Sequence, residues 1–219
     1  YLKVRSWDSW LASVTGLAAE VVREVHLVEI FPELETRGLL HCFQRVLSEG
    51  VVEKLSPPAY PYLLPCLPRQ YSKYFEYMQQ QVTIAPLREQ DQIIGIIVTI
   101  EDLTPQLDRE RELSELSEQL KSADESIRVH AAQALATQSD EGKKEAETLV
   151  EALGDESWRV RQVAIDMLVQ RSGPDAVATL VGKIRDQHRD MRVLNSALKA
   201  LTQVKGDIIT PLTDLLRLP

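Results

Sequence analysis

The segment QIIGIIVTIEDLTPQLDRERELSELSEQL, residues 92–120, holds the change of architecture along this chain. It opens with a short run rich in isoleucine and valine, and such a run between polar residues predicts a strand that is covered on both faces. Asp102 and Thr104 then offer side-chain oxygens that can turn the backbone, and Pro105 suits the first turn of a helix because it has no amide hydrogen to lose. We therefore expect Asp102, Thr104 and Pro105 to form the joint between a buried strand and a helix.

Beyond the joint, leucines recur at roughly helical spacing among many charged residues, at positions 107, 113, 116 and 120. This pattern predicts an amphipathic connecting helix at residues 105–121. The composition of the chain changes at this point. We therefore divide it into a first domain at residues 1–104, the connecting helix, and a second domain at residues 122–219.

Composition and charge are those of an ordinary soluble protein, with 44% hydrophobic and 26% charged residues among 219. The 33 acidic residues outnumber the 25 basic ones, and the formal net charge of −8 offers no basic face for a nucleic acid. No apolar run approaches the roughly 20 residues that span a bilayer. Cys42 and Cys66 lack any paired spacing, which suits free thiols inside a cell. We expect a cytoplasmic protein that binds neither nucleic acid nor membrane.

The first domain predicts an α+β fold with an antiparallel sheet, because several short helices precede three consecutive strands. Gly16 and Gly50 are each expected to end a helix. The prolines between residues 57 and 68 restrict that segment to an edge strand or a loop. The expected helices cover residues 4–15, part of 18–34 and 35–49, and the expected strands cover 51–55, 74–87 and 92–101.

Four features of residues 1–104 resemble a PAS domain: WDSWLASVTG at 7–16, FPEL at 31–34 before a helix that ends in glycine, three closing strands, and EDLT at 101–104. The resemblance implies a sheet that senses a small ligand or mediates dimerisation. It departs from the family because the usual first strand, which would precede Tyr1, is missing. It also implies a ligand pocket, and the candidates for its lining are Phe43, Leu47, Tyr62, Leu64, Val82, Ile84 and Val98.

His41 and Cys42 lie where some PAS proteins hold haem or flavin. The predicted apolar stripe of that helix consists of residues 39, 40, 43, 46 and 47, so His41 falls near its rim and is expected to be a surface histidine. The string HCFQ at 41–44 matches only part of the Asn-Cys-Arg-Phe-Leu-Gln motif of photoactive flavin-binding relatives. We therefore expect neither haem nor flavin, and the identity of any cofactor or ligand is unknown.

Internal repetition is the strongest signal in the second domain. LKSADESIRVHAAQAL, residues 120–135, aligns without gaps on LGDESWRVRQVAIDML, residues 153–168, at a shift of 33. A third unit, residues 184–201, follows more loosely at a further shift of 31, with Asn195 where the earlier units have alanine. Each unit predicts apolar-periodic helices that can bury their apolar faces only against the next pair.

An apolar residue followed by arginine recurs at one position of the three units: Ile127-Arg128, Val160-Arg161 and Met191-Arg192. This pattern resembles HEAT repeats, in particular the short kind found in phycobilisome-lyase-like proteins. The resemblance implies an α-solenoid that binds a protein partner. The chain begins without methionine and stops after about three units, so we expect a fragment of a protein with further repeats.

The three repeated arginines have two interpretations. They can form a basic ladder for an anionic partner, but the acidic composition favours a structural role, in which each bonds a carboxylate or a helix-end carbonyl of a neighbouring unit. Asp155 and Asp186 are the candidate carboxylates. Trp158 falls in a turn between helices, and a large aromatic side chain on a repeat surface is our candidate for a partner contact.

The sequence shows no catalytic constellation, because its histidines are scattered and it has no phosphate-binding loop, nucleophile elbow or metal-ligand spacing. We expect a regulatory protein and not an enzyme, in which the PAS-like domain senses a ligand and the repeats present a surface to a protein partner. One alternative is a scaffold without a ligand that forms a homodimer through the sheet and the leucines of the connecting helix. A bilin-lyase-like enzyme component is a further alternative, and it rests on fold analogy alone.

Overall fold

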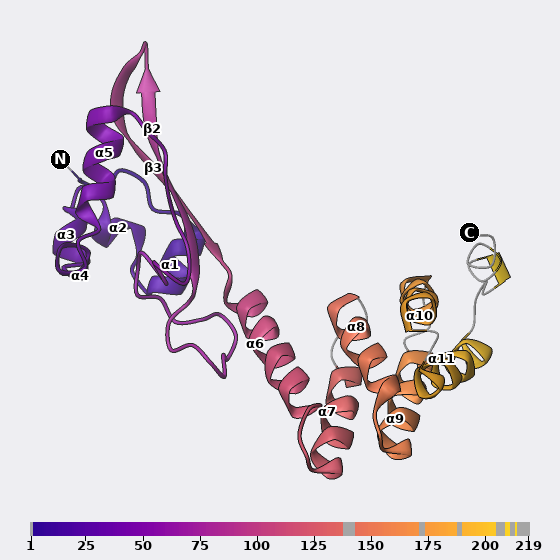
Figure 1. Ribbon diagram of the computed structural model, residues 1–219. Helices are drawn as coiled ribbons and strands as arrows, with labels where there is room; N and C mark the ends of the chain where they lie inside the picture. Colours follow the sequence, from indigo (N-terminus) through magenta and orange to yellow (C-terminus); the bar gives the residue numbers. More distant parts are fainter. Residues whose placement is uncertain are drawn as a thin grey trace. The chain divides into compact units, whose positions relative to one another are not determined.

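The computed structural model describes residues 2–137, 143–170, 174–187, 190–204, 209–210 and 213. The chain forms two compact units, residues 1–111 and 112–219, and the division falls inside helix α6, Thr104–Gln119 (Figure 1). This helix corresponds to the predicted connecting helix at residues 105–121. The order of elements, an α+β part followed by a helical part, is the order that the sequence predicts.

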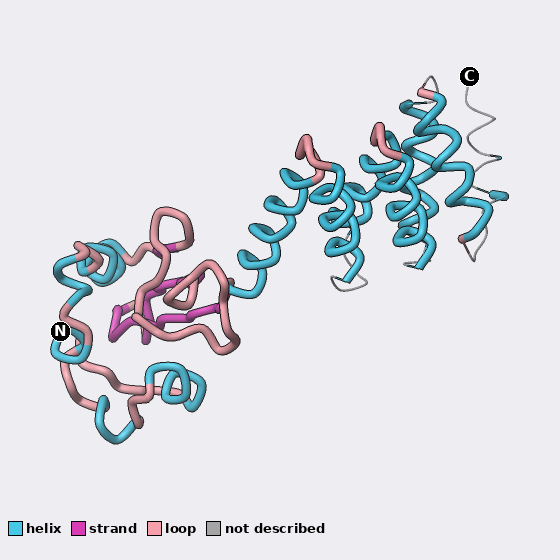
Figure 2. The backbone as a smooth tube through the Cα atoms, turned by 90° about the horizontal axis from the view of Figure 1, so that it is seen from below, coloured by secondary structure: helices cyan, strands magenta, loops and turns pink. Residues whose placement is uncertain are grey.

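The first unit is a three-stranded antiparallel sheet accompanied by short helices, as predicted (Figure 2). The strands follow the order β1-β2-β3, so that β2 is central. Strand β1 is Glu53–Leu55, β2 is Gln80–Glu89 and β3 is Gln92–Asp102. The helices are α1 Ser9–Thr15, α2 Ala19–Val22, α3 Leu27–Ile30, α4 Glu33–Thr36 and α5 Leu40–Glu49.

Strand β3 is covered on one face only, so the prediction of a strand buried on both faces is wrong. Val98 and Ile100 pack against the core of the first unit, whereas Ile94 and Ile97 are 57% and 52% exposed. The reason is the small size of the sheet: β3 lies at its edge, and the unit has a single layer of core on one side of three strands. Among the described residues, the opposite face has no covering element.

Strand β2 begins at Gln80, later than predicted, and continues through Pro86 to Glu89. Proline is tolerated here because β1 pairs only with Val82–Ile84, which leaves β3 as the single partner of β2 at Pro86. A residue without an amide hydrogen fits where a strand has a neighbour on one side only.

Three single-turn helices, α2, α3 and α4, start within residues 18–34, where the sequence predicts one short helix. Glu24, between α2 and α3, has a φ of 64°, and Gly38, after α4, has a φ of 69°. Both are left-handed conformations that end a helical turn, and Gly38 is the reason that α5 starts at Leu40 and not earlier. The predicted end of this helix at Gly50, also left-handed, is confirmed.

The second unit consists of helices stacked in two layers (Figures 1 and 2). Helices α7, α9 and α11 contact one another in this order and form one layer, and α8 contacts α10 in the other. One hydrophobic core runs between the layers. The predicted helical repeats are thus present. The helices are α7 Glu125–Thr137, α8 Lys143–Glu151, α9 Trp158–Gln170, α10 Pro174–Gln187 and α11 Met191–Gln203, with a 3-10 turn at Ala152–Gly154.

The structural period of the repeats is 33 residues throughout. The residue before each of α7, α9 and α11 accepts a hydrogen bond from the backbone two residues later, and these capping residues are Asp124, Ser157 and Asp190. The predicted shift of 31 for the third unit is therefore wrong. An error of two residues matters because it turns each side chain by about 200° around the helix axis. The alanine position that seemed lost at Asn195 is Ala197, which is fully buried.

Three of the four predicted leucines, in α6 and directly after it, belong to the repeat core or pack against it. Leu116 is 7% exposed within that core, and Leu113 and Leu120 pack against it. These three side chains therefore contact the repeat core of their own chain, and a homodimer through the connecting helix stays a prediction. An amphipathic stripe on a helix does not reveal by itself whether its partner is the same chain or a second copy.

Candidate functional site

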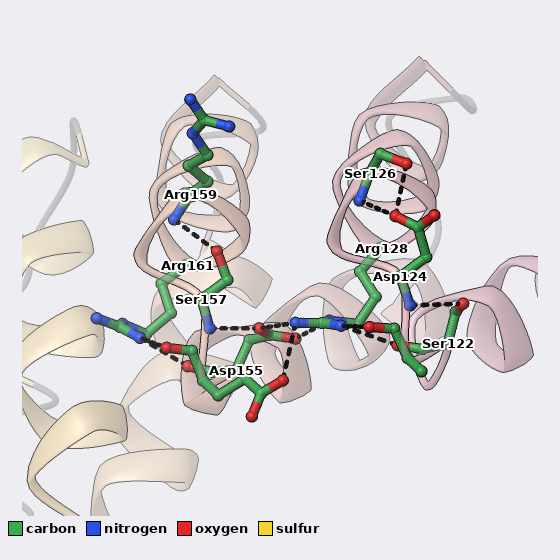
Figure 3. A network of polar contacts seen from close by, with 10 residues as sticks. Ser122, Asp124, Ser126, Arg128, Asp155, Ser157, Arg159 and Arg161 are labelled. Carbon is green, nitrogen blue, oxygen red and sulfur yellow. Dashed lines mark hydrogen bonds and ion pairs between the residues drawn. The ribbon is translucent and has the colours of Figure 1, made fainter.

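A polar network joins helices α7 and α9 (Figure 3). Arg128 donates from Nε and Nη2 to the two carboxylate oxygens of Asp155, at 2.9 and 3.1 Å. Its Nη1 donates to the carbonyl oxygens of Ser122 and Ala123. The Arg128 and Asp155 side chains are only 6% and 11% exposed. This forked ion pair connects two consecutive repeats, and the predicted pairing of Arg128 with Asp155 is confirmed.

Arg161 repeats half of this arrangement one unit later. Its Nη1 donates to the carbonyl oxygens of Asp155 and Glu156 at 2.7 and 3.0 Å, the positions 33 residues after the carbonyls that Arg128 contacts. The position equivalent to the Asp155 carboxylate is His188, which lies outside the described residues. Arg161 thus braces the start of its own helix in the same way as Arg128 does.

Each repeat arginine bonds a carboxylate or a carbonyl, as predicted, but Asp186 as a partner and a neighbouring-unit contact for Arg192 are wrong. Asp186 accepts from Arg185 Nε at 3.0 Å instead of pairing with a repeat arginine. Arg192 occupies a different repeat position and contacts its own capping residue, Asp190, at 3.4 Å. At the 33-residue period the third unit has Leu194 where the first two have arginine. There is consequently no basic ladder of three arginines for an anionic partner.

An open groove of about 680 Å³ lies between α7 and α9, on the face that carries Trp158. Trp158 is the first residue of α9, and its side chain is 66% exposed. The half-buried side chains of Val129 and Val163 supply the apolar floor. The lining residues are Asp124, Glu125, Ser126, Val129, Trp158, Arg159, Gln162 and Val163.

The position of Trp158 in the repeat explains its exposure. The equivalent first residues of α7 and α11 are Glu125 and Met191, which are also exposed. This position contributes nothing to the core in any of the three units. A tryptophan that stays in water has no part in folding the repeat, and large aromatic side chains of this kind are enriched at the centres of protein interfaces.

The charged residues that line the groove are Asp124 and the ion pair of Glu125 with Arg159. Asp124 Oδ1 accepts hydrogen bonds from the amide and the hydroxyl of Ser126, at 2.7 and 2.6 Å. These hydrogen bonds lower the pKa of Asp124, so that it is ionised at neutral pH. Glu125 pairs with Arg159 across the groove at 3.6 Å. Figure 3 shows Asp124 and Arg159 on these two neighbouring helices.

The pocket candidates of the first unit lie in or beside its packed core. Phe43, Leu64, Val82 and Ile84 are each 3% exposed or less and belong to one cluster, which Val98 contacts from β3. Leu47 and Tyr62 are half-buried at its margin, and Arg37 lies over the Tyr62 ring at 4.1 Å from its centroid. The structure thus brings five of the seven candidates together as a core.

The predicted joint residues line a groove of about 590 Å³ in the first unit. Asp102 Oδ1 accepts from the amide of Thr104 at 2.9 Å, and Thr104 Oγ1 accepts from the amide of Gln79 at 2.8 Å. Thr104 is 2% exposed, and its hydroxyl fixes the first turn of α6 to Gln79, the residue directly before β2. The groove is lined by Trp10, Pro68, Arg69, Gln70, Tyr71, Ile100, Asp102, Thr104, Pro105 and Asp108.

His41 is exposed, as predicted, but Cys42 lies in the core. The predicted stripe is buried at Leu39, Phe43 and Val46 and half-buried at Leu40 and Leu47, and Cys42 is buried in addition. Burial raises the pKa of the Cys42 thiol, and it raises that of Cys66 to about 11, so both thiols are protonated at neutral pH. Within the described residues, no group of His, Cys, Asp and Glu is arranged to hold a metal ion, and no helix is long and apolar enough to cross a membrane.

Residues 113–202 and 146–219 match a family model of HEAT repeats. The resemblance of the second part of the chain to HEAT repeats is therefore confirmed, and repeats of this kind commonly mediate protein interactions. No curated protein matches the chain. The matched residues lie within the helical unit, so the resemblance of residues 1–104 to PAS domains stays a prediction.

The sequence pointed to Trp158 but not to the groove around it. No sequence motif marks Asp124, Glu125 or Arg159 as members of one site, because a groove depends on which helices are neighbours. One signal was available: helix-capping residues recur at 124, 157 and 190, and this spacing places the residues that follow them at the same end of one layer.

Proposed function

We propose that residues 112–219 form a protein-interaction scaffold that binds its partner in the groove between α7 and α9. The observation that carries this proposal is the 66% exposure of Trp158 beside the half-buried Val129 and Val163. An exposed aromatic anchor next to an apolar floor, with a rim of charged side chains, is typical of an interface centre. The function that we propose for this groove is the binding of a protein partner.

Photo-crosslinking from the groove tests this function in cells that produce the protein. A photoreactive phenylalanine analogue at position 158 should capture a discrete protein partner, whereas the same analogue at Met191 should not. Met191 is the matched control because it holds the equivalent position of the next unit and is 60% exposed. With the partner purified, Trp158→Ala should weaken binding about tenfold and Met191→Ala should leave it unchanged. Equal crosslinking from both positions would reject the groove as the interface.

For the first unit we propose an interaction role through the uncovered face of the sheet, in the form of a homodimer. Leu87 of β2 is 42% exposed and pairs with Gly95, next to Ile94, while Ile97 is exposed further along β3. A contiguous apolar patch on a sheet is a site of association. Light scattering after gel filtration should report a dimer that Ile97→Glu converts to a monomer. A wild-type monomer at 100 micromolar would remove this role.

A ligand-sensing role, which the PAS resemblance implies, is supported by the groove at the joint more than by the core. Most of the side chains that were proposed to line a central pocket fill the core instead. Asp102, Thr104 and Pro105 line the open groove that also contains Trp10. Native mass spectrometry of the purified chain tests this role. The wild-type protein should carry extra mass that disappears on denaturation, and Trp10→Ala should lack this mass. If Trp10→Ala retains it, the ligand binds elsewhere.

A further inference from the structure

The charges of the α7–α9 groove determine which partner it can take, and this inference rests on the scaffold function proposed above. The groove contains the carboxylates of Asp124 and Glu125 and a single cation, Arg159. Arg159 is engaged with Glu125 at 3.6 Å. Within the described part of the chain, Asp124 forms no ion pair. An occupant therefore meets two carboxylates and one guanidinium, a net charge of −1, beside the exposed Trp158.

The neighbouring contact between α9 and α11 shows how a cation binds on this face. Lys199 of α11 reaches to α9 and donates from Nζ to Gln162 Oε1 at 2.6 Å. Gln162 Nε2 in turn donates to Asp166 Oδ1 at 2.7 Å. A lysine of the chain itself thus bridges these two helices, with its ammonium directed toward a relay that ends in a carboxylate. The α7–α9 groove contains Gln162 as well, and no lysine of the chain lines it.

Tryptophan adds a second attraction for cations. The negative face of the indole ring attracts an ammonium or guanidinium group, and a nearby carboxylate attracts the same cation independently. The apolar floor of Val129 and Val163 requires a hydrocarbon side chain next to that cation. Residues 112–219 carry 18 acidic and 14 basic side chains, so the repeat unit as a whole also favours a basic partner.

From these observations we propose that the groove binds a protein segment in which a lysine or arginine stands beside an aliphatic side chain. The cation lies between Trp158 and Asp124, and the aliphatic side chain covers Val129 and Val163. Arg159 repels acidic segments unless they displace it from Glu125, so the groove discriminates by charge as well as by shape. Arg128 does not take part because its fork is committed to Asp155.

Three blocked hexapeptides provide the test with the full 219-residue chain. They have glycine at both ends and leucine at the third and fifth positions, and they carry lysine, glutamine or glutamate at the second and fourth. Each is titrated into labelled protein, and the indole N–H signal of Trp158 is followed by NMR. This signal is identified by its absence in Trp158→Phe, and the indoles of Trp7 and Trp10 serve as internal controls.

The lysine peptide should shift the Trp158 signal saturably, with a dissociation constant about three- to fivefold below that of the glutamine peptide. Asp124→Asn should remove this preference, because asparagine still caps α7 but carries no charge. Trp158→Ala should weaken the binding of both peptides, followed through the amide of Val129, and Met191→Ala should weaken neither. The preference should decline at high salt.

Each contrary result has a distinct meaning. Equal affinity for the lysine and glutamine peptides overturns the basic partner but leaves a peptide-binding groove in place. Tighter binding of the glutamate peptide reverses the assigned charge. Lysine-dependent shifts spread over the whole surface reveal non-specific attraction and overturn the proposal too. If no peptide shifts the signal, the basic segment is rejected, and crosslinking from position 158 then decides independently whether the scaffold function stands.

Discussion

Arg128 makes five hydrogen bonds with the start of its own repeat and with the loop before the next. Its guanidinium satisfies two carbonyl oxygens at the turn before α7 and grips Asp155 at the turn before α9. Hydrogen bonding to Asp155 raises the pKa of Arg128 further above neutrality, so the guanidinium stays charged. Because both side chains are nearly buried, loss of one partner leaves the other charge without compensation.

Replacement of Arg128 by alanine should lower the free energy of unfolding by about 2–4 kcal/mol. Arg128→Lys should recover only part of this loss, because lysine cannot reproduce the two-pronged contact. Urea unfolding followed by circular dichroism measures both effects. The control is Arg192→Ala, since the Arg192 side chain is 56% exposed and its removal should cost less than about 0.5 kcal/mol. Similar losses in the two alanine variants would show that the ion pair of Arg128 with Asp155 contributes no more to the free energy of unfolding than an exposed contact does.

Gln80 has a comparable role in the first unit. Its side chain is fully buried, with Oε1 accepting from the amides of Leu63 and Leu64, and Nε2 donating to the carbonyl of Leu64 at 2.7 Å. Gln80→Leu keeps the volume but leaves these backbone groups unpaired, and it should destabilise the protein by about 2–3 kcal/mol. The neighbouring Gln81→Leu, on the exposed face, should change stability by less than about 0.5 kcal/mol. Thermal or urea unfolding that ranks the two variants equally would contradict this account.

At the scale of elements, the caps of α7 and α11 differ from the cap of α9. Asp124 and Asp190 accept hydrogen bonds at the N-termini of α7 and α11, and these bonds lower the pKa of both carboxyls. Ser157 caps α9 through its hydroxyl and does not titrate in this range. The helix dipole adds to the preference for an ionised cap.

This difference predicts how acid affects the repeats. A carboxyl whose pKa is lowered by folding contributes stability that is fully present above its unfolded value near 3.9 and is lost as the pH falls through the folded value. Between about pH 5 and pH 3, the unfolding midpoint in urea should therefore fall less steeply in the double variant Asp124→Asn, Asp190→Asn than in the wild type. Asp186→Asn, which changes a carboxylate that caps no helix, should leave the slope unaltered. A double variant with the wild-type slope would exclude these caps as the source.

At the scale of the whole molecule, α6 is shared by the two units. Its first half is attached to the first unit, where Ser72 Oγ donates to Asp108 at 2.7 Å and Arg111 lies 4.6 Å from the ring centroid of Phe75. Its second half supplies Leu116 to the repeat core. One helix therefore contributes to the stability of both units, and we expect their unfolding to be coupled.

Two glycines inserted between Arg111 and Glu112 should break this coupling, at a cost of about 2 kcal/mol of helix stability. In a Trp158→Phe background, the fluorescence of Trp7 and Trp10 reports on the first unit, and circular dichroism at 222 nm is dominated by the repeats. The two thermal midpoints should coincide without the insertion and separate with it. The control places the same insertion after Gln90 in the exposed β2–β3 turn. Midpoints that already differ in the uninterrupted chain would show that the units unfold independently.

The sequence alone was sufficient to predict the order of elements, the end of a helix at Gly50, the repeated helices and the surface position of Trp158. These features follow from apolar periodicity, turn-forming residues and internal repetition, which are all local in the chain. The predicted position of the third repeat was wrong by two residues because Arg192 was aligned with Arg161. The true alignment of the helices follows from their capping residues and their buried alanines.

Only the tertiary structure decided which face of β3 is covered, that Cys42 of α5 is buried, and where a groove forms beside Trp158. Each depends on contacts between segments far apart in sequence: β3 is exposed because no element covers its outer face in the described residues, and Cys42 is buried because the sheet lies against it. Asp124 and Trp158 are 34 positions apart and share a groove only because α7 and α9 stack. A linear pattern specifies what each helix can bury, and the packing of helices specifies what remains open to a partner.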